Sequence, residues 1–357
     1  MARRTMLRGL GLAGLGAAAA GLGGCGLRWE SDAPNLPLLP RDRHPGAAAL
    51  RAELARVEAA CQATAAAGDA VAAAANTEQV QALVARLTAV NDIRPDDPAL
   101  GLLTPAVPDP VDPTSPTNPT SPPRPPANDA KPRAVTAQWA GLDAETTEGI
   151  AAGGADGQDL LLLASVQVGR LALGRRLGGR WAALSPGDGI AGVSPATATT
   201  LLASARRTAY LLDVCAARAS DAQKSAAAGG RDAVHRIVLD LGAAATAPTG
   251  DATGSRDGAT PPPPLGYPLQ APTTPEEVAS LAGGALTDLS DAIVAAMPDE
   301  WARVADTADT ADTADTSGTS VPAAAAKTVS ALRRRAAECE QWHTAWTTQV
   351  RGLPGLR

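Results

Sequence analysis

Two pairs of an acidic residue and a histidine have the three-residue spacing found in metal sites on helices. Asp232 precedes His235 by three positions, Glu340 precedes His343 by three, and the whole chain of 357 residues has only three histidines. Helical bundles that hold two metal ions take such pairs from two helices and single carboxylates from the other two. The spacing therefore raises the hypothesis of a metal or redox protein with a site near His235 and His343.

The positions of these residues around their helices argue against a metal site. At about 100° per residue, His343 lies at the centre of its apolar stripe, whereas Glu340 lies roughly 80° away. On the other helix His235 lies roughly 110° from the stripe, and Asp232 points nearly opposite the core. The other candidate acids also lie off their stripes: Asp213, Asp288 and Asp291. We expect no metal and no cofactor, with His343 hydrogen-bonded at the edge of the core and Glu340 in solvent.

The first 24 residues have the order of an export signal. Arg3, Arg4 and Arg8 precede an uncharged run of Leu, Ala and Gly over residues 9–24. This run is shorter than the roughly 20 residues of a membrane span, so a signal peptide is the better interpretation. The pair Arg3-Arg4 resembles a twin-arginine signal, which exports proteins already folded. The general secretion route stays open, because paired arginines also occur in its signals.

Cys25 follows this run directly. The sequence Leu22-Gly23-Gly24-Cys25 resembles a bacterial lipobox, and this resemblance implies that Cys25 carries a diacylglyceryl group and begins the mature chain. Two or three acyl chains hold a protein firmly to a bilayer. We therefore expect a lipid-anchored protein on the outer face of the cytoplasmic membrane. The alternative is that Cys25 only lies near an ordinary cleavage site.

Three further cysteines remain, Cys61, Cys215 and Cys339. An exported protein meets an oxidising environment in which disulfides form. Cys215 and Cys339 both fall on apolar stripes of predicted helices, so they are the candidate disulfide pair. The alternative is that all three are small buried hydrophobic side chains.

The composition favours helices and excludes several functions. The chain has no Phe, two Tyr and six Trp, so Ala, Leu and Val supply most of the packing, and alanine favours helices over strands. A formal charge of −6 argues against a nucleic-acid partner. No Ser/His/Asp constellation or phosphate-binding glycine loop is present. The basic run Arg333–Arg335 is interpreted as a solvated face. We expect a non-catalytic protein that binds an envelope protein or a small ligand.

The composition also divides the chain into parts. Thirteen prolines fall within residues 95–133, which marks a disordered insertion. The predicted parts are a signal peptide (1–24), a lipidated Pro-rich tether (25–46), a helical hairpin (47–91, with helices 47–75 and 77–91), the Pro-rich insertion (92–133), a helical region (134–185, with helices 134–152 and 158–178), a four-helix bundle (194–350) and a C-terminal tail (351–357).

The predicted bundle has two long loops. Its helices cover about 195–220, 231–245, 274–297 and 323–350, and its loops cover 246–272 and 299–322. Ser194 and Thr274 have the residue types of N-caps. Gly229-Gly230 is expected to separate the first two helices, and Pro298 to end the third. Whether residues 47–185 pack on this bundle is left open by the sequence.

Five short stretches of the C-terminal part occur in a recognisable order. They are Ala209-Tyr210, Ala233-Val234-His235-Arg236, Gly266-Tyr267-Pro268-Leu269, the stretch from Pro272 to Glu277, and the stretch from Arg351 to Leu356. In this order they resemble the ferritin-like domain of actinobacterial lipoproteins of unknown function. The resemblance implies an all-α fold with a four-helix bundle and a long crossover between its second and third helices. Arg206-Arg207 stand where that family has a glutamate, which weakens the metal hypothesis further.

Overall fold

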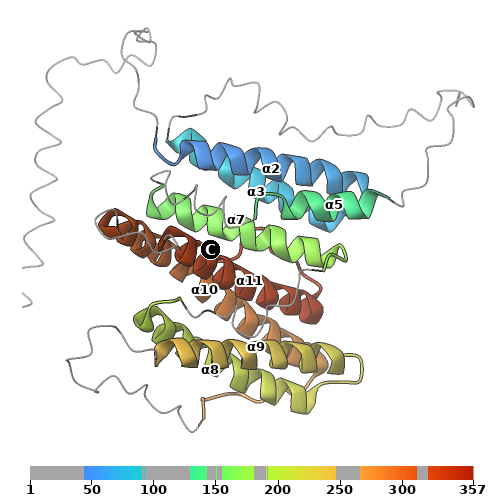
Figure 1. Cartoon of the computed structure of the whole chain (residues 1–357). Coiled ribbons are helices and arrows are strands. Elements are labelled where there is room, and N and C mark those ends of the chain that lie inside the picture. Colours follow the sequence, from blue (N-terminus) through green and yellow to red (C-terminus); the bar gives the residue numbers. More distant parts are fainter. Residues whose placement is uncertain are drawn as a thin grey trace, which may run out of the picture. The chain divides into compact units, whose positions relative to one another are not determined.

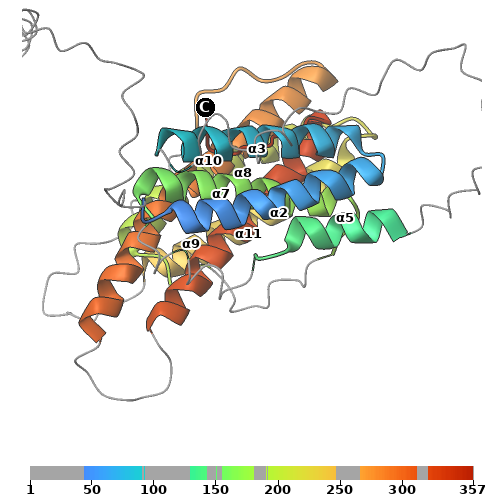
Figure 2. The ribbon, with the colours of Figure 1, turned by 90° about the horizontal axis from the view of Figure 1, so that it is seen from above.

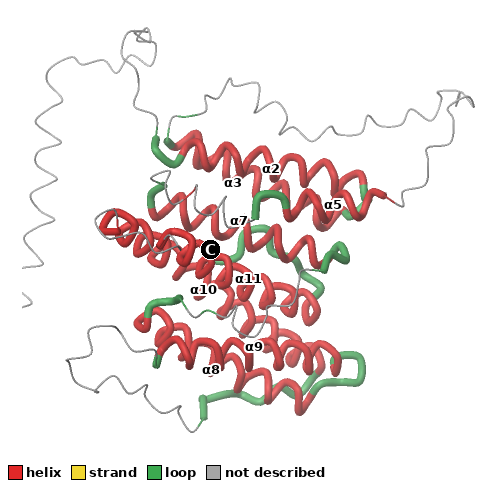
Figure 3. The backbone as a smooth tube through the Cα atoms, viewed as in Figure 1, coloured by secondary structure: helices red, strands yellow, loops and turns green. Residues whose placement is uncertain are grey.

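The described residues form helices and no strands, as the composition predicts. The computed structural model describes residues 44–90, 92, 129–142, 150, 155–180, 190, 192–246, 266–311 and 321–356. Within them every regular element is an α-helix (Figure 3), which confirms the all-α class. The export signal with Arg3 and Arg4, the cysteine at position 25 and most of the Pro-rich insertion lie outside the described residues.

The helices stack in layers (Figures 1 and 2). They are α2 (Ala47–Ala66), α3 (Ala70–Ala89), α5 (Ala130–Trp139), α7 (Gly157–Arg176), α8 (Pro195–Arg218), α9 (Lys224–Ala245), α10 (Pro275–Ala311) and α11 (Val321–Thr347). The antiparallel pair α10 and α11 lies in the middle, with α8 and α9 packed on one side and α7 on the other. Helices α2, α3 and α5 cover the far side of α7.

One continuous core joins the N-terminal helices to the C-terminal ones. Leu50 of α2, Leu163 of α7 and Leu332 of α11 are fully buried members of the same hydrophobic cluster, which also includes Leu212 of α8 and Ile237 of α9. Residues 43–357 form one compact unit. The helices between residues 47 and 178 therefore pack on the C-terminal helices rather than standing apart from them.

Local capping explains why several helices begin where they do. Ser194 accepts a hydrogen bond from the Thr197 backbone and Pro195 follows it, so α8 begins as predicted. At the start of α10 the Thr274 backbone N–H donates to the Glu277 carboxylate, and the Glu277 backbone N–H donates to the Thr274 hydroxyl, which makes a capping box. Asp156 caps α7 in the same way, a feature that the sequence reading missed.

The boundary between α2 and α3 differs from the prediction. Helix α2 ends at Ala66 rather than at 75, because Gly68 adopts a positive φ of 74° and breaks the helix. Asp69 then caps α3 by accepting a hydrogen bond from the Ala72 backbone. Thr77, the expected N-cap, lies inside α3 and bonds back to the Ala73 carbonyl.

Two expected helix breakers lie inside helices. Gly229-Gly230 falls within α9, and Gly229 lies so close to the ring of Trp342 on α11 that no Cβ fits there. Pro298 falls within α10, which continues to Ala311. Met297 and Trp301, on either side of the proline, are both buried, so packing offsets the lost backbone hydrogen bond. The predicted loop 299–322 is correspondingly shorter, and α11 ends at Thr347 rather than at 350.

Two glycines of α9, Gly229 and Gly242, should respond in opposite ways to substitution by alanine. A Cβ on Gly229 would overlap the ring of Trp342, whereas a Cβ on Gly242 would meet nothing within 4 Å. We expect Gly229→Ala to lower the free energy of unfolding by about 1–3 kcal/mol through overpacking. Gly242→Ala should raise it by about 0.5–1 kcal/mol, the usual gain in a helix interior. Urea unfolding followed by circular dichroism measures both, and effects of the same sign would contradict the packing described.

Candidate functional site

The structure separates the four residues of the metal hypothesis. His235 and Asp232 lie on the outer face of α9, and both side chains are more than half exposed. The His235 Nε2 atom is 3.6 Å from an Asp213 carboxylate oxygen on α8, and Asp232 pairs with Arg231. Neither residue faces α11, so neither meets Glu340 or His343.

His343 is held inside the pair of α10 and α11. Its Nδ1 atom lies 3.2 Å from both the Thr287 hydroxyl and the Gly283 carbonyl of α10. Its Nε2 atom lies 3.2 Å from the Thr347 hydroxyl one turn along α11. These neutral partners hold both ring nitrogens, which agrees with the prediction of a hydrogen-bonded histidine at the core edge.

The prediction that Glu340 is solvated is wrong. Glu340 is only 2% exposed, and its carboxylate accepts two hydrogen bonds from the guanidinium of Arg351. The position of Glu340 around its own helix does not determine its burial, because a different segment of the chain covers it. The C-terminal tail folds back after α11 and covers the side of the helix on which Glu340 lies.

The run Arg333–Arg335 is also more buried than predicted. Arg333 and Arg335 are almost fully buried, because α11 is surrounded by α7, α9 and α10. Arg335 forms ion pairs with Asp240 of α9 and with Glu338. Arg333 donates to the side-chain oxygen of Gln167, at 2.7 Å. The solvated-face interpretation is therefore wrong for the first and third arginines of the run.

A second buried ion pair joins α2 to α7. The Arg170 guanidinium lies 2.6 Å from the Glu53 carboxylate, and both side chains are 0% exposed. Arg170 also donates to the carbonyls of Ala137 and Ala140 at the end of α5. One charged pair therefore holds three helices together, and both charges are used in doing so.

A polar cluster that the sequence reading missed lies where α2 begins. The Nε2 atom of His44 is 2.5 Å from a carboxylate oxygen of Asp159, a fully buried residue in the first turn of α7. Arg86 of α3 bonds to both Asp159 and Asp156, at 2.7 and 2.6 Å. These residues are 70 to 115 positions apart in the chain, so no local pattern could have revealed them.

This cluster has metal-type ligands, but an arginine already pairs with both of its carboxylates. His44, Asp156 and Asp159 are the one group of three such residues close together in the described part of the chain. Arg86 supplies the positive charge that a cation would otherwise bring. Partial burial alone would raise the pKa of Asp156, but the Asp159 backbone N–H and the charge of Arg86 lower it. We therefore assign the cluster the structural role of fastening the start of α2 to α3 and α7.

The candidate disulfide between Cys215 and Cys339 is not formed. Cys61, Cys215 and Cys339 are free thiols, and Cys215 points to the Val278 carbonyl near the start of α10. On α11, Cys339 lies between His343, which contacts Thr287 of α10, and Ala336, which contacts Ser290 of α10. Cys339 is therefore beside the part of α10 between Thr287 and Ser290, about ten residues beyond Val278. At 1.5 Å per helical residue, the two thiols are about 15 Å apart along the bundle, beyond the reach of a disulfide.

The same burial predicts low thiol reactivity. Burial raises the pKa of the Cys215 thiol to about 11, and burial with the charges of Glu338 and Glu340 raises that of Cys339 well above its usual value. Because the thiolate is the reactive form, a thiol reagent at pH 8 should modify Cys61 first and the other two only after unfolding. Mass spectrometry of alkylated peptides tests this. A Cys215–Cys339 cross-link in unreduced protein would contradict it.

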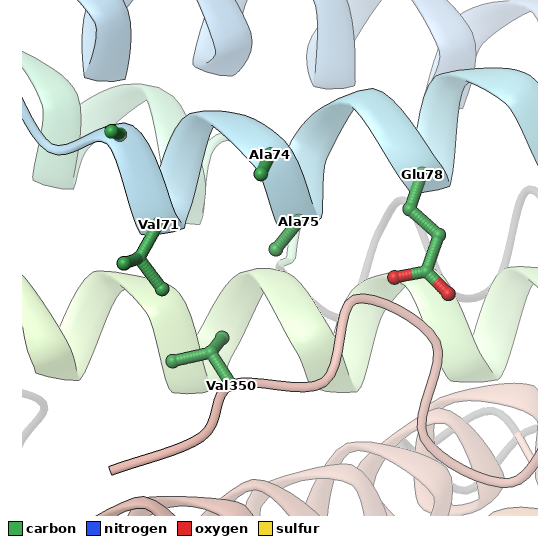
Figure 4. Close-up of a pocket in the computed structure, with 6 residues that line it drawn as sticks. Val71, Ala74, Ala75, Glu78 and Val350 are labelled. Atoms are coloured by element: carbon green, nitrogen blue, oxygen red, sulfur yellow. The ribbon is translucent and has the colours of Figure 1, made fainter.

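A shallow apolar hollow lies on the first turns of α3 (Figure 4). It has a volume of about 390 Å³ and is lined by Ala70, Val71, Ala74, Ala75, Glu78 and Val350. Val71 and Ala75 point from α3 toward Val350 of the C-terminal tail. Val71 is 45% exposed, which is unusual for a large apolar side chain in this body. The hollow is open to solvent, so it suits an apolar side chain better than an enclosed small molecule.

Comparisons with known protein families, with curated proteins and with solved structures found no match to this chain. Among the described helices, the part of α10 from Pro275 to Arg303 has the length and composition of a membrane span, but half of its most apolar window is buried inside the body. The central helix of a bundle has the same properties.

Proposed function

We propose that this chain is a lipid-anchored, non-catalytic protein of the cell envelope. The anchor is the diacylglyceryl group expected on Cys25, which would hold the helical body on the outer face of the cytoplasmic membrane. The body would bind a protein partner or a small ligand there. The proposal rests on the N-terminal order of arginines, apolar run and cysteine, together with the chemistry of the described body.

The proposal that the protein is not an enzyme is supported by the pairing of its buried carboxylates with arginines. Glu53 is held by Arg170, Glu340 by Arg351, and Asp159 by Arg86. A catalytic acid or base must reach a substrate in a cleft, with its proton free to move. Each of these carboxylates is instead neutralised by an arginine that ties two parts of the body together, which favours a structural role.

We also propose that α8 to α11 form a ferritin-like bundle. Three features support this arrangement: α8 packs on α9 and on α10, α9 packs on α11, and residues 246–274 connect the second helix to the third. That is the neighbour pattern of a bundle with one long crossover. The separation of His235 from His343 gives no support to a metal or redox function.

Cell fractionation tests the proposed location. The chain should sediment with membranes, resist extraction by high salt and be extracted by detergent, because acyl chains rather than charges hold it. Protease added outside intact spheroplasts should digest the body while a cytoplasmic marker survives. Recovery in the soluble cytoplasmic fraction, or protection from the added protease, would refute the proposal.

A further inference from the structure

The two tyrosines of the chain lie against each other. Tyr210 is in the second half of α8, and Tyr267 is in residues 266–274, which lead into α10 and which we call the lead-in segment. The sequence has no other tyrosine, and these two are 57 positions apart. Their ring centroids are 5.4 Å apart and their planes are tilted by 52°, which is a direct aromatic contact. We call them the tyrosine pair.

The lead-in segment runs along α8 without forming a helix or a strand. Its second contact with α8 is at Pro272, whose carbonyl accepts a hydrogen bond of 3.1 Å from Arg218. Tyr210 and Arg218 are about 12 Å apart along the helix, and the chain from Tyr267 to Pro272 spans at most about 18 Å. The segment is therefore extended and parallel to α8, in a register that places one tyrosine on the other.

The tyrosine pair is accessible, and one of its members can move. Both tyrosines are half-buried, so a small oxidant in solution can reach their rings. Tyr267 lies in a segment without regular structure, and such segments move more readily than helices, so its ring can approach Tyr210 more closely. No disulfide fastens this segment to α8, because the cysteines in the described part of the chain are free thiols.

We propose that the tyrosine pair is an oxidative cross-linking site, at which a haem peroxidase with hydrogen peroxide joins the two rings into dityrosine. Each phenol loses one electron and its phenolic proton, and the two radicals form one carbon–carbon bond between ring carbons next to the hydroxyls. The hydrogens on those two carbons then move, through water, to the phenolic oxygens. In total two electrons and two protons leave the pair, and they reduce one hydrogen peroxide to two waters.

The cross-link would lock the lead-in segment, and with it the start of α10, onto α8. It closes a loop of 57 residues that includes all of α9. Covalent closure of a long loop restricts the unfolded chain and so stabilises the folded one. The inference goes beyond the proposed function but rests on its location for the oxidant, because oxidising conditions prevail outside the cytoplasm.

Oxidation of the purified full chain tests the inference. The probe is a haem peroxidase with hydrogen peroxide, added at a protein concentration low enough to suppress links between molecules. Trypsin should then release the peptide of residues 208–218 joined to the peptide of residues 257–303, lighter than their sum by two hydrogen atoms. The blue fluorescence of dityrosine should rise in parallel. We also expect the cross-linked chain to unfold at a higher urea concentration than the untreated chain.

A matched control keeps two tyrosines but separates them. Tyr267→Phe retains the ring and removes the phenol, and Val71→Tyr adds a phenol at a half-exposed position of α3, in another layer of the body (Figure 1). This double variant should form at least tenfold less cross-link within one chain than the wild type. Tyr210→Phe is the second control, and the same oxidation should leave its urea midpoint unchanged.

Each outcome decides for or against the inference. Equal cross-linking in the wild type and the double variant, or dityrosine found only between chains, would overturn it. A cross-linked chain whose urea midpoint does not rise would overturn the proposed lock. The reaction uses purified protein, so its result is independent of where the chain resides. An anchored chain that does not cross-link would therefore contradict this inference and leave the proposed function intact.

Discussion

A chain with Cys25→Ser is expected to leave the membrane. Without the thiol no diacylglyceryl group can be attached, and the formal charge of −6 gives the chain no attraction to an anionic lipid surface. Two or three acyl chains give firm anchoring, whereas their loss leaves only contacts of the body. We expect the membrane-bound fraction to fall at least tenfold and the incorporation of labelled palmitate to disappear. Fractionation and autoradiography measure the two effects.

Cys61→Ser is the matched control for this experiment. Cys61 is a half-buried thiol between α2 and α3, and its substitution should change neither fractionation nor palmitate labelling. A Cys25→Ser chain that stays in the membrane fraction and is still labelled would show that another residue carries the anchor.

The largest effect on stability is expected from Glu53→Ala. Arg170 and Glu53 are both fully buried, so removing the carboxylate leaves a guanidinium without its charged partner inside the body. Breaking a buried pair in this way costs about 3–5 kcal/mol. Urea unfolding should show a loss of that size, and α5 should lose protection from hydrogen exchange because Arg170 also holds its last carbonyls.

Glu58→Ala on the same helix is the matched control. Burial raises the pKa of Glu58, and no ion pair to it is described, so removing its carboxylate should change the free energy of unfolding by no more than about 0.5 kcal/mol. Replacing both members of the buried pair, with Glu53→Leu and Arg170→Met, should cost less than Glu53→Ala alone. Equal losses for Glu53→Ala and Glu58→Ala would refute the role assigned to the pair.

Features that depend on one helix at a time could be predicted from the sequence. The apolar stripes of the first and last bundle helices were predicted, and Leu201, Leu212, Leu332 and His343 are buried as expected. The caps at Ser194 and Thr274 were predicted as well, because a cap involves residues only three apart. Such features are local, and the residues that form them are neighbours in the chain.

Features that depend on a neighbouring helix could not be predicted in the same way. Glu340 and Arg333 lie off the stripe of α11 and are buried all the same, because other segments cover that helix on several sides. Gly229 lies inside a helix, where a tryptophan more than a hundred residues away leaves no room for a side chain. The pairing of His44 with Asp159 depends on the register of two helices, which a single sequence does not fix.

The mass of the N-terminal peptide of the membrane-extracted chain tests the lipid anchor most directly. We expect the mature chain to begin at Cys25 and its first peptide to be heavier than the bare sequence by a diacylglyceryl group. A chain that keeps residues 1–24, or one whose Cys25 is a free thiol behind another N-terminus, would contradict it.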